Sequence, residues 1–400
     1  MTTTAPDRTQ PLTGVTVLDF TQVFMGPSAT QLLGDYGADV IKVERPGTGD
    51  ISRTSIPDEA GLDNPIFLSI NRNKRSIALD TRTEEGLAAV RELARTADVV
   101  VSNFRAGVME RLGLGYEDLK ALNPRVIWAC GTGFGSSGPY AHKGGQDAVA
   151  QAYSGVMWRR PADDDPVGLY ATTLCDYTTG MHLLQGILLA LLHRDRTGEG
   201  QRVEVSMYDS MLHMQMQEAC QQLNRGSEIN WAAMPLTGVF PTTDGAVIFV
   251  GGFRDNALHH LSIALELDED LSLRPELATL DQQFAARPEL QEIFRAAVAG
   301  RSTEYWVKRL EEQDILCAPV RSLADALADE QTAVNDMVVE MRHPVAGTVR
   351  ALNAPIKLSA AEATVRRVPP RLGEHGDEIL TQLGYDAERI ALLREKGVLR

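Results

Sequence analysis

Cysteine is scarce and scattered in this 400-residue sequence, which contains four. No two of them form a CxxC pair, so the sequence indicates neither a zinc site nor a disulfide framework. The adjacent His259 and His260 also lack a partner at metal-ligand spacing. We therefore expect no metal centre, and reduced thiols of the kind typical of a cytoplasmic protein. The cysteines are Cys130, Cys175, Cys220 and Cys317.

Long apolar runs and excess positive charge are missing as well. The most apolar stretch, residues 181–192, is shorter than the roughly 20 residues that a membrane span needs. Residues 1–10 are polar and rich in threonine, so we expect a frayed tail there and no secretory signal. A formal net charge of −15 disfavours nucleic acid as a partner, and any anionic ligand requires a local basic cluster.

Strand-like and helical segments alternate through the first part of the chain. A Gly-Pro step at residues 26–27 opens a predicted helix that ends before Gly37, and helical spacing covers residues 84–96. This alternation predicts an α/β fold with a parallel sheet covered by helices on both faces. The predicted strands are residues 15–20, 38–43, 76–79, 98–101 and 125–130.

The remaining pattern suggests a second, smaller domain. We expect two long helices at residues 176–193 and 208–222, on either side of a strand at 201–205. From about residue 224 the chain becomes mostly helical and acidic, with a short strand at 246–250. The tail carries a strand-like piece at 348–352 and a last helix near 388–396. We therefore divide the chain into a large domain over 1–224, a small domain over 225–325, and a linker and C-terminal segment over 326–400.

A glycine-rich motif, residues 133–138, matches the GxGxxG pattern of dinucleotide-binding proteins. That mechanism needs a helix whose N-terminus faces the pyrophosphate. Here Pro139 and Tyr140 follow at once, with Gly144 and Gly145 close behind, so we expect no helix. The motif is better interpreted as a loop at the carboxyl end of a strand, where it can line a ligand cleft.

Asp176 is the first candidate for chemistry, because it comes just before a strongly apolar predicted helix. One interpretation is an N-cap, for which aspartate is well suited. The other is functional: the helix N-terminus would keep the carboxylate ionised, and a carboxylate can attack an activated acyl group. No GxSxG elbow or Ser-His-Asp order offers a different nucleophile.

Two further features each allow two interpretations when the residues alone are considered. Gln146 lies between the glycine loop and a predicted helix. It is either a surface or capping residue, or part of a cleft. A scattered set of bases is either a solvated surface or an anion site for phosphates. These bases are Lys42, Arg45, Arg53, Arg72, Lys74, Arg75, Arg82, Arg105 and Arg111.

Over residues 12–399 the sequence resembles the class III CoA-transferases. This family includes formyl-CoA transferase, carnitine-type CoA-transferases and α-methylacyl-CoA racemase. The ordered matches are VLDF (17–20) with Gly26 and Pro27, GADVIKVERPG (37–47) with Gly49 and Asp50, NKRSIALD (73–80), NF (103–104), RLG (111–113), NPRVI (123–127), LCD (174–176) with Gly180, GEGQRV (198–203), CAPV (317–320) and LGEH (372–375).

The resemblance implies a Rossmann-like large domain built from both chain ends, a smaller α+β domain, and an interlocked homodimer. It makes Asp176 the nucleophile: its carboxylate attacks an acyl-CoA thioester, and an aspartyl anhydride and an aspartyl thioester then carry the CoA to a carboxylic acid acceptor. An anhydride is as activated as the thioester, whereas a serine ester would trap the acyl group. Acyl-CoA is thus implied as substrate, with no permanently bound cofactor.

The resemblance also implies the residues that bind CoA. Phe24 and Met25 match the loop beside the thioester, and Lys143 begins the loop that covers the pantetheine end and reaches Gln146. The remaining matching positions are Arg45, Leu79, Asp80, Thr81, Arg82, Asn103, Phe104, Arg105 and Arg111.

Two departures from the family narrow the expected reaction. The racemase has a histidine where Gln146 stands, and an amide cannot exchange a proton at neutral pH, so acyl-CoA racemisation is the alternative rather than the first expectation. Formyl-CoA transferase has a glutamine where Phe24 stands and four glycines where this chain offers only Gly251 and Gly252. A less polar acyl group is therefore expected. The sequence also leaves room for a non-catalytic acyl-CoA binder or a nucleotide-dependent oxidoreductase.

Overall fold

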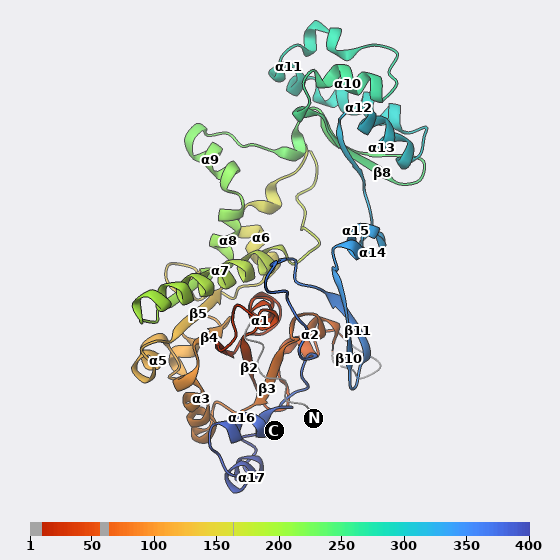
Figure 1. Ribbon diagram of the computed structural model, residues 1–400. Coiled ribbons are helices and arrows are strands. Elements are labelled where there is room, and N and C mark those ends of the chain that lie inside the picture. Colours follow the sequence, from red (N-terminus) through yellow and green to blue (C-terminus); the bar gives the residue numbers. More distant parts are fainter. Residues whose placement is uncertain (1–9, 57–63, 163) are drawn as a thin grey trace. The chain divides into compact units, whose positions relative to one another are not determined.

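The computed structural model describes residues 10–56, 64–162 and 164–400, which form two compact units (Figure 1). The first unit comprises residues up to 156, 169–215 and 333–400; the second comprises 157–168 and 216–332. The expected frayed tail lies outside the described residues except for Gln10. That residue is buried, and its side-chain amide donates to the carbonyl of Glu362 (2.7 Å), so fraying does not extend to residue 10.

A six-stranded parallel sheet forms the centre of the first unit, which confirms the predicted α/β class. Its strand order is β3-β2-β1-β4-β5-β6, so the order reverses its direction between β1 and β4. In open α/β sheets, ligands bind beyond the carboxyl ends of the strands at such a reversal. The strands are β1 (Thr16–Asp19), β2 (Asp39–Glu44), β3 (Lys74–Ala78), β4 (Val99–Ser102), β5 (Ile127–Thr132) and β6 (Arg202–Ser206).

A hydrophobic core lies on each face of this sheet, since successive side chains of a strand point to opposite sides. Val17 packs in the core beneath α1 (Met25–Asp35) and α7 (Leu174–Thr197). Its neighbour Leu18 packs in the opposite core, beneath α3 (Glu84–Thr96). The smaller helices of this unit are α2 (Pro65–Ile70), α4 (Val108–Arg111), α5 (Tyr116–Leu122), α6 (Asp147–Tyr153) and α8 (Met207–Met214).

The C-terminal segment returns to β3. Its backbone bonds the strand at two points: the N–H of His375 donates to the carbonyl of Ser76 (2.9 Å), and that of Arg400 to Ala78 (3.1 Å). Figure 1 shows the last part of this segment, with α16, in dark blue beside β3. Its elements are β10 (Val338–His343), β11 (Gly347–Leu352), α16 (Gly376–Gln382) and α17 (Ala387–Glu395).

The second unit has a three-stranded antiparallel sheet in the order β7-β8-β9. Phe240 stacks on Phe249 with ring centroids 4.7 Å apart, and Phe294 meets both edge-on. Its elements are α9 (Met216–Arg225), β7 (Thr237–Pro241), β8 (Ala246–Val250), α10 (Ala257–Ala264), α11 (Leu280–Ala285), α12 (Arg287–Val298), α13 (Thr303–Glu312), β9 (Leu316–Pro319) and α14 (Leu323–Ala328), with α15 (Glu330–Val334) at its boundary.

One predicted helix is in fact two. The helix expected over 208–222 breaks at Gln215, which has φ −92° and ψ 30° and separates α8 from α9. The Gln215 side-chain amide donates to the carbonyls of Ser154 and Met211 (3.0 Å each), and these bonds hold the break. No helix in the described part of the chain is long and apolar enough to cross a membrane.

Candidate active site

A cavity of about 340 Å³ opens at the carboxyl ends of β1, β4 and β5, where the strand order reverses. Gln22 follows β1 and Asn103 follows β4, and the two bind each other across the reversal. The N–H of Gln22 donates to Asn103 Oδ1 (2.8 Å), and Asn103 Nδ2 donates to the carbonyl of Gln22 (2.7 Å). The cavity is lined by residues 22–25, 103–106 and 131–134, with Ile51, Ala141, Lys143, Gly145, Gln146, Asp176 and Met207.

Asp176 lies in the first turn of α7, as the third helical residue, and its side chain lines the cavity. The N-cap position belongs to Thr173, so the interpretation of Asp176 as the cap is wrong. Capping comes from Asp147, whose Oδ2 accepts the N–H groups of Cys175 (2.7 Å) and Asp176 (3.0 Å). Since another carboxylate binds the free amides of the helix, the Asp176 carboxyl remains available to the cavity.

The protonation of Asp176 differs from the expectation. Burial, and to a lesser degree the negative charge of Asp147, raises the pKa of the Asp176 carboxyl to about 7. The prediction that the helix N-terminus keeps this group fully ionised is therefore wrong near neutral pH. A carboxylate that water solvates poorly is a stronger nucleophile than one on the surface, provided that it is deprotonated.

Asp147 ends the candidate segment of residues 144–147, but sequence reasoning assigned it no role of its own beside Gln146. It is buried at the start of α6, and its second oxygen accepts from Gln151 Nε2 (2.7 Å). Gln146 occupies the N-cap position of α6 without a side-chain capping bond, and its exposed side chain lines the cavity. The one available signal was an aspartate at the predicted start of a helix, which is too common to single out.

Glycines bring the walls of the cavity together. A Cβ on Gly180 of α7 would lie 2.5 Å from the carbonyl oxygen of Met25 and from Ser28 Oγ, so α7 and α1 pack backbone against backbone. A Cβ on Gly133 would lie 2.4 Å from Gly145 Cα. The predicted role of the GxGxxG segment as a cleft-lining loop is thus confirmed, since Gly133 lines the cavity and no helix follows it.

The structure brings eight of the predicted site residues to this cavity. Lys143 stands at its edge among aromatic rings: its ammonium donates to the Tyr153 hydroxyl (2.6 Å) and lies 4.7 Å from the Tyr140 ring centroid. This contact raises the pKa of Lys143, so the side chain stays cationic. The eight residues are Phe24, Met25, Asn103, Phe104, Arg105, Lys143, Gln146 and Asp176.

The other predicted CoA-binding residues do not line the cavity. Arg45 directly follows β2, and residues 79–82 follow β3, so they lie at the same edge of the sheet. Leu79 is buried in the core, and the exposed Arg82 binds Asp80 (2.7 Å), whose pKa falls to about 2 chiefly through that bond. Arg111 is exposed at the end of α4. Thr81 lies between Asp80 and Arg82 in the same turn.

The five remaining bases form neither a solvated surface nor an anion site. All of them are buried, and each pairs with a carboxylate inside the first unit. Their charge is therefore neutralised by the protein itself and is not offered to a phosphate. The pairs are Lys42–Asp50 (2.8 Å), Arg53–Glu44 (2.8 Å), Arg72–Asp35 (2.6 Å), Lys74–Asp19 (3.1 Å) and Arg75–Asp39 (2.5 Å).

A carboxyl of raised pKa in a cleft at the reversal of a parallel sheet is a candidate nucleophile for an α/β enzyme. Comparison with known proteins then identifies the family. The model of CoA-transferase family III matches residues 12–376, so the chain belongs to that family and is an enzyme of this class. The resemblance inferred from the sequence motifs is thereby confirmed.

Individual relatives agree with this assignment over nearly their whole length. The chain is 36% identical to succinyl-CoA:glutarate CoA-transferase of Mus musculus, covering 98% of this chain and 91% of that protein. It is 34% identical to formyl-CoA:oxalate CoA-transferase of Escherichia coli, covering 97% and 99%. Among solved structures, a CaiB/BaiF family protein from Brucella suis is similar with a TM-score of 0.83 and 33% identity, covering 94% of this chain and 99% of that one.

Proposed function

We propose that this enzyme moves CoA from an acyl-CoA donor to a carboxylic acid acceptor through covalent intermediates on Asp176. The observation that carries the proposal is the placement of this carboxyl: it lines a cavity at the sheet reversal, with its helix capped by Asp147 and not by itself. Membership of CoA-transferase family III supports the reaction class.

In the first half of the reaction, an Asp176 oxygen attacks the thioester carbonyl of the donor. The C–S bond breaks, CoA leaves as its thiolate, and a mixed anhydride joins Asp176 to the acyl group. The thiolate then attacks the aspartyl carbonyl of that anhydride. The donor acid leaves as a carboxylate, and Asp176 carries CoA as a thioester.

The second half repeats these steps in reverse. The acceptor carboxylate attacks the aspartyl thioester and expels CoA thiolate, which gives a new anhydride. The thiolate attacks the acceptor's carbonyl in that anhydride, which releases acceptor-CoA and frees the Asp176 carboxylate. No proton need be transferred to carbon, and this agrees with an exposed amide, Gln146, at the position where a proton-transferring group would be needed for racemisation.

The acyl group is proposed to lie against Phe24 and Met25, which line the same cavity as Asp176. These side chains favour a donor with a hydrocarbon portion over a one-carbon or purely polar acyl group. The mouse relative is named for succinyl-CoA and glutarate, whose carbon chains have that character. We therefore propose short dicarboxylic acids and related acids as the substrate class to test first.

The CoA nucleotide is proposed to lie at the carboxyl edge of β2 and β3. Arg45, Arg82 and Arg111 are exposed there or nearby, and exposed guanidinium groups suit phosphate oxygens. Backbone groups of residues 79–82 would complete the site, because the Leu79 side chain is buried. Arg105 and Lys143 at the cavity would contact the pantetheine end.

A second copy of the chain is proposed to complete the molecule, as an interlocked homodimer that acts in the cytoplasm. Large apolar side chains of α7 are exposed, including Leu189 (67%) and Leu192 (57%). None of the residues of α9 is buried, and Leu223 within it is 84% exposed. Exposed large apolar side chains on each of these helices support a protein interface there. The cysteines, all in the described residues, are free.

Trapping the covalent intermediate tests the proposal. The enzyme is incubated with succinyl-CoA and hydroxylamine, and the peptide that contains Asp176 is examined by mass spectrometry. We expect an aspartyl hydroxamate at Asp176 and none in Asp176→Asn, which keeps the size of the side chain. If Asp176 stays unmodified with every donor of a panel of acyl-CoA esters, while those donors are consumed, the mechanism is wrong.

A further inference from the structure

One wall of the cavity is a strained loop. Residues 20–24 connect β1 to α1, and Gln22, Val23 and Phe24 among them line the cavity. Val23 has φ +69°, a left-handed conformation that a β-branched residue rarely adopts. The loop is also tightly closed, since a Cβ on Gly26 would lie 2.4 Å from Thr21 Cβ. Such a conformation persists only where the surroundings impose it.

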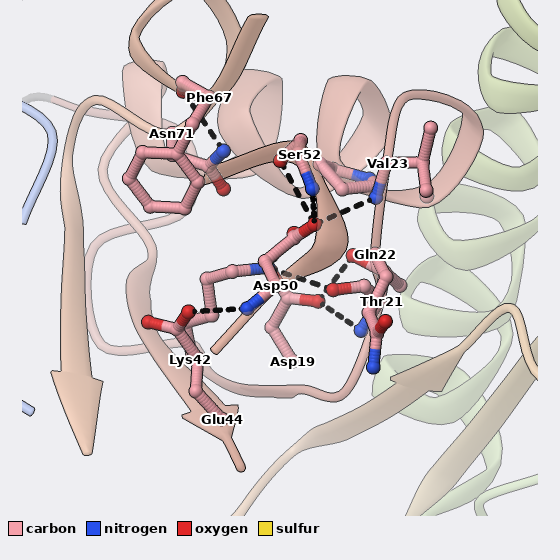
Figure 2. A network of polar contacts seen from close by, with 12 residues as sticks. Asp19, Thr21, Gln22, Val23, Lys42, Glu44, Asp50, Ser52, Phe67 and Asn71 are labelled. Carbon is pink, nitrogen blue, oxygen red and sulfur yellow. Dashed lines mark hydrogen bonds and ion pairs between the residues drawn. The ribbon is translucent and has the colours of Figure 1, made fainter. Parts of the chain in front are cut away.

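Three consecutive residues of this loop are held by side chains from elsewhere. Lys42 Nζ donates to the carbonyl of Thr21 (2.7 Å). Gln22 is bound on both backbone groups by Asn103, as described above. The N–H of Val23 donates to Asp50 Oδ1 (3.0 Å). Figure 2 shows Thr21, Gln22 and Val23 along one strand of chain, with Asp50 between this loop and Lys42.

Asp50 and Lys42 hold each other as well as the loop. Their charged groups lie 2.8 Å apart, and neither side chain is exposed. The Lys42 charge and local hydrogen bonds lower the pKa of Asp50 against the effect of burial, so both groups stay ionised. A buried ion pair of this kind is a weak source of stability, because desolvation offsets the attraction. The geometry that this pair imposes on the loop is therefore a better guide to its role than its contribution to stability.

Both carboxylate oxygens of Asp50 have partners, and this is why an asparagine could not take its place. Oδ1 accepts from Val23 N–H (3.0 Å), Ser52 N–H (2.8 Å) and Ser52 Oγ (2.8 Å), while Oδ2 faces the Lys42 ammonium. An asparagine has one oxygen and one NH₂ group. Whichever way its amide turned, the NH₂ group would face either the ammonium or the loop's donors.

We propose that Asp50 is a positioning residue, whose buried pair with Lys42 fixes the loop of residues 21–24 and so shapes the acyl end of the pocket. Ile51, the next residue along the chain, also lines the cavity, so Asp50 links two of its walls. This inference rests on the proposed function for its kinetic consequence, although the loop itself can be observed without substrate.

Asp50→Asn tests the inference, with Asp35→Asn as the matched control. Asp35 also pairs with a buried base, Arg72 (2.6 Å), but has no bond to the loop. We expect Asp50→Asn to lower kcat at least tenfold while KM for acyl-CoA changes less than about threefold, because displacements of about 1 Å near reacting groups cost rate. Asp35→Asn should lower Tm comparably and leave kcat within about twofold. Equal kcat losses in the two variants overturn the proposal.

Rescue and hydrogen exchange separate positioning from general stability. Adding Val23→Gly to Asp50→Asn should recover kcat at least threefold, since glycine adopts φ +69° without a clamp. Backbone amides of residues 21–24 should exchange at least tenfold faster in Asp50→Asn than in wild type. Unchanged exchange there overturns the proposal without reference to any reaction.

The outcomes also keep this inference distinct from the proposed function. If wild-type protein transfers no CoA and traps no acyl group, the proposed function fails, and the exchange rates alone decide the role of Asp50. If Asp50→Asn does not fold, the double variant Lys42→Met/Asp50→Asn replaces it, because it removes the pair without leaving a buried ammonium unpaired. Loop amides should again exchange at least tenfold faster than in wild type, and no increase overturns the proposal.

Discussion

At the scale of single residues, the carboxyl of Asp176 sets the pH at which the proposed chemistry works. Its raised pKa, about 7, means that the nucleophilic carboxylate forms as pH rises through neutrality. We predict that kcat/KM for the acyl-CoA donor increases about tenfold between pH 6 and pH 8, because it reports ionisation of the free enzyme. A flat profile over this range in folded enzyme contradicts the account.

The same shift predicts a stability difference that needs no substrate. A carboxyl whose pKa is raised in the folded state binds more protons folded than unfolded between pH 3.8 and about 7, so its contribution to stability falls as pH rises. Asp176→Asn should therefore gain stability relative to wild type as pH rises, by about 1–3 kcal/mol between pH 5 and pH 8. Thermal unfolding at the two pH values measures this, and equal differences at both would falsify the raised pKa.

Asp147 acts on Asp176 through both charge and backbone. Asp147→Asn removes a neighbouring negative charge, so the pKa of Asp176 should fall and the pH–rate profile should move to lower pH. Asp147→Ala also removes the bonds to the N–H groups of Cys175 and Asp176, and should cost about 1 kcal/mol of stability, as other lost helix caps do. The profile of Asp147→Asn would contradict this account if its midpoint stayed that of wild type.

At the scale of elements, the close packing of α1 on α7 places Phe24 and Met25 beside Asp176. Gly180→Ala should destabilise the protein by about 1–3 kcal/mol and reduce activity, because the added methyl meets the backbone carbonyl of Met25. Gly186→Ala on the same helix is the control. Its methyl meets one Val203 methyl group, which can move, so its loss should be smaller in thermal unfolding.

The elements that sequence patterns predict well are those whose signal is local. The alternation of buried strands with helices located the parallel sheet, and Pro27 marked the start of α1 because proline fits the first turn of a helix. The break at Gln215 depends on bonds to Ser154 and Met211, one of them distant in sequence, so periodicity showed one helix where two exist. The strands β7, β9 and β10 were missed.

The residues of the candidate site likewise divide into those that local motifs locate and those that only the fold brings together. Motifs located Asp176 and the loop at Phe24, whereas Asp147 and Asp50 act through contacts between residues far apart in sequence, which no spacing shows. Likewise Lys42 and Lys74 look like solvated bases in the sequence. Their burial depends on Asp50 and Asp19 being brought to them by the fold.

At the scale of the whole molecule, the proposed interlocked dimer predicts that subunits do not exchange between folded dimers. The chain has a mass of 43.7 kDa, so light scattering should give about 87 kDa, twice that value. Two threaded chains cannot separate without unfolding. Tagged and untagged protein, mixed after folding, should therefore form no mixed dimers, whereas refolding them together should produce them. Rapid mixing of native protein contradicts interlocking, and a mass of one chain contradicts dimerisation.

The most direct test of the proposed covalent intermediates on Asp176 follows an oxygen atom of the acceptor acid. If the acceptor carboxylate forms an anhydride with Asp176, attack by CoA thiolate on the acceptor's carbonyl leaves the bridging oxygen on the aspartate. Enzyme that turns over with ¹⁸O-labelled acceptor acid should therefore acquire ¹⁸O in the side chain of Asp176, detected by mass spectrometry of its peptide. Turnover that forms acceptor-CoA while the Asp176 peptide keeps its natural mass would contradict the account.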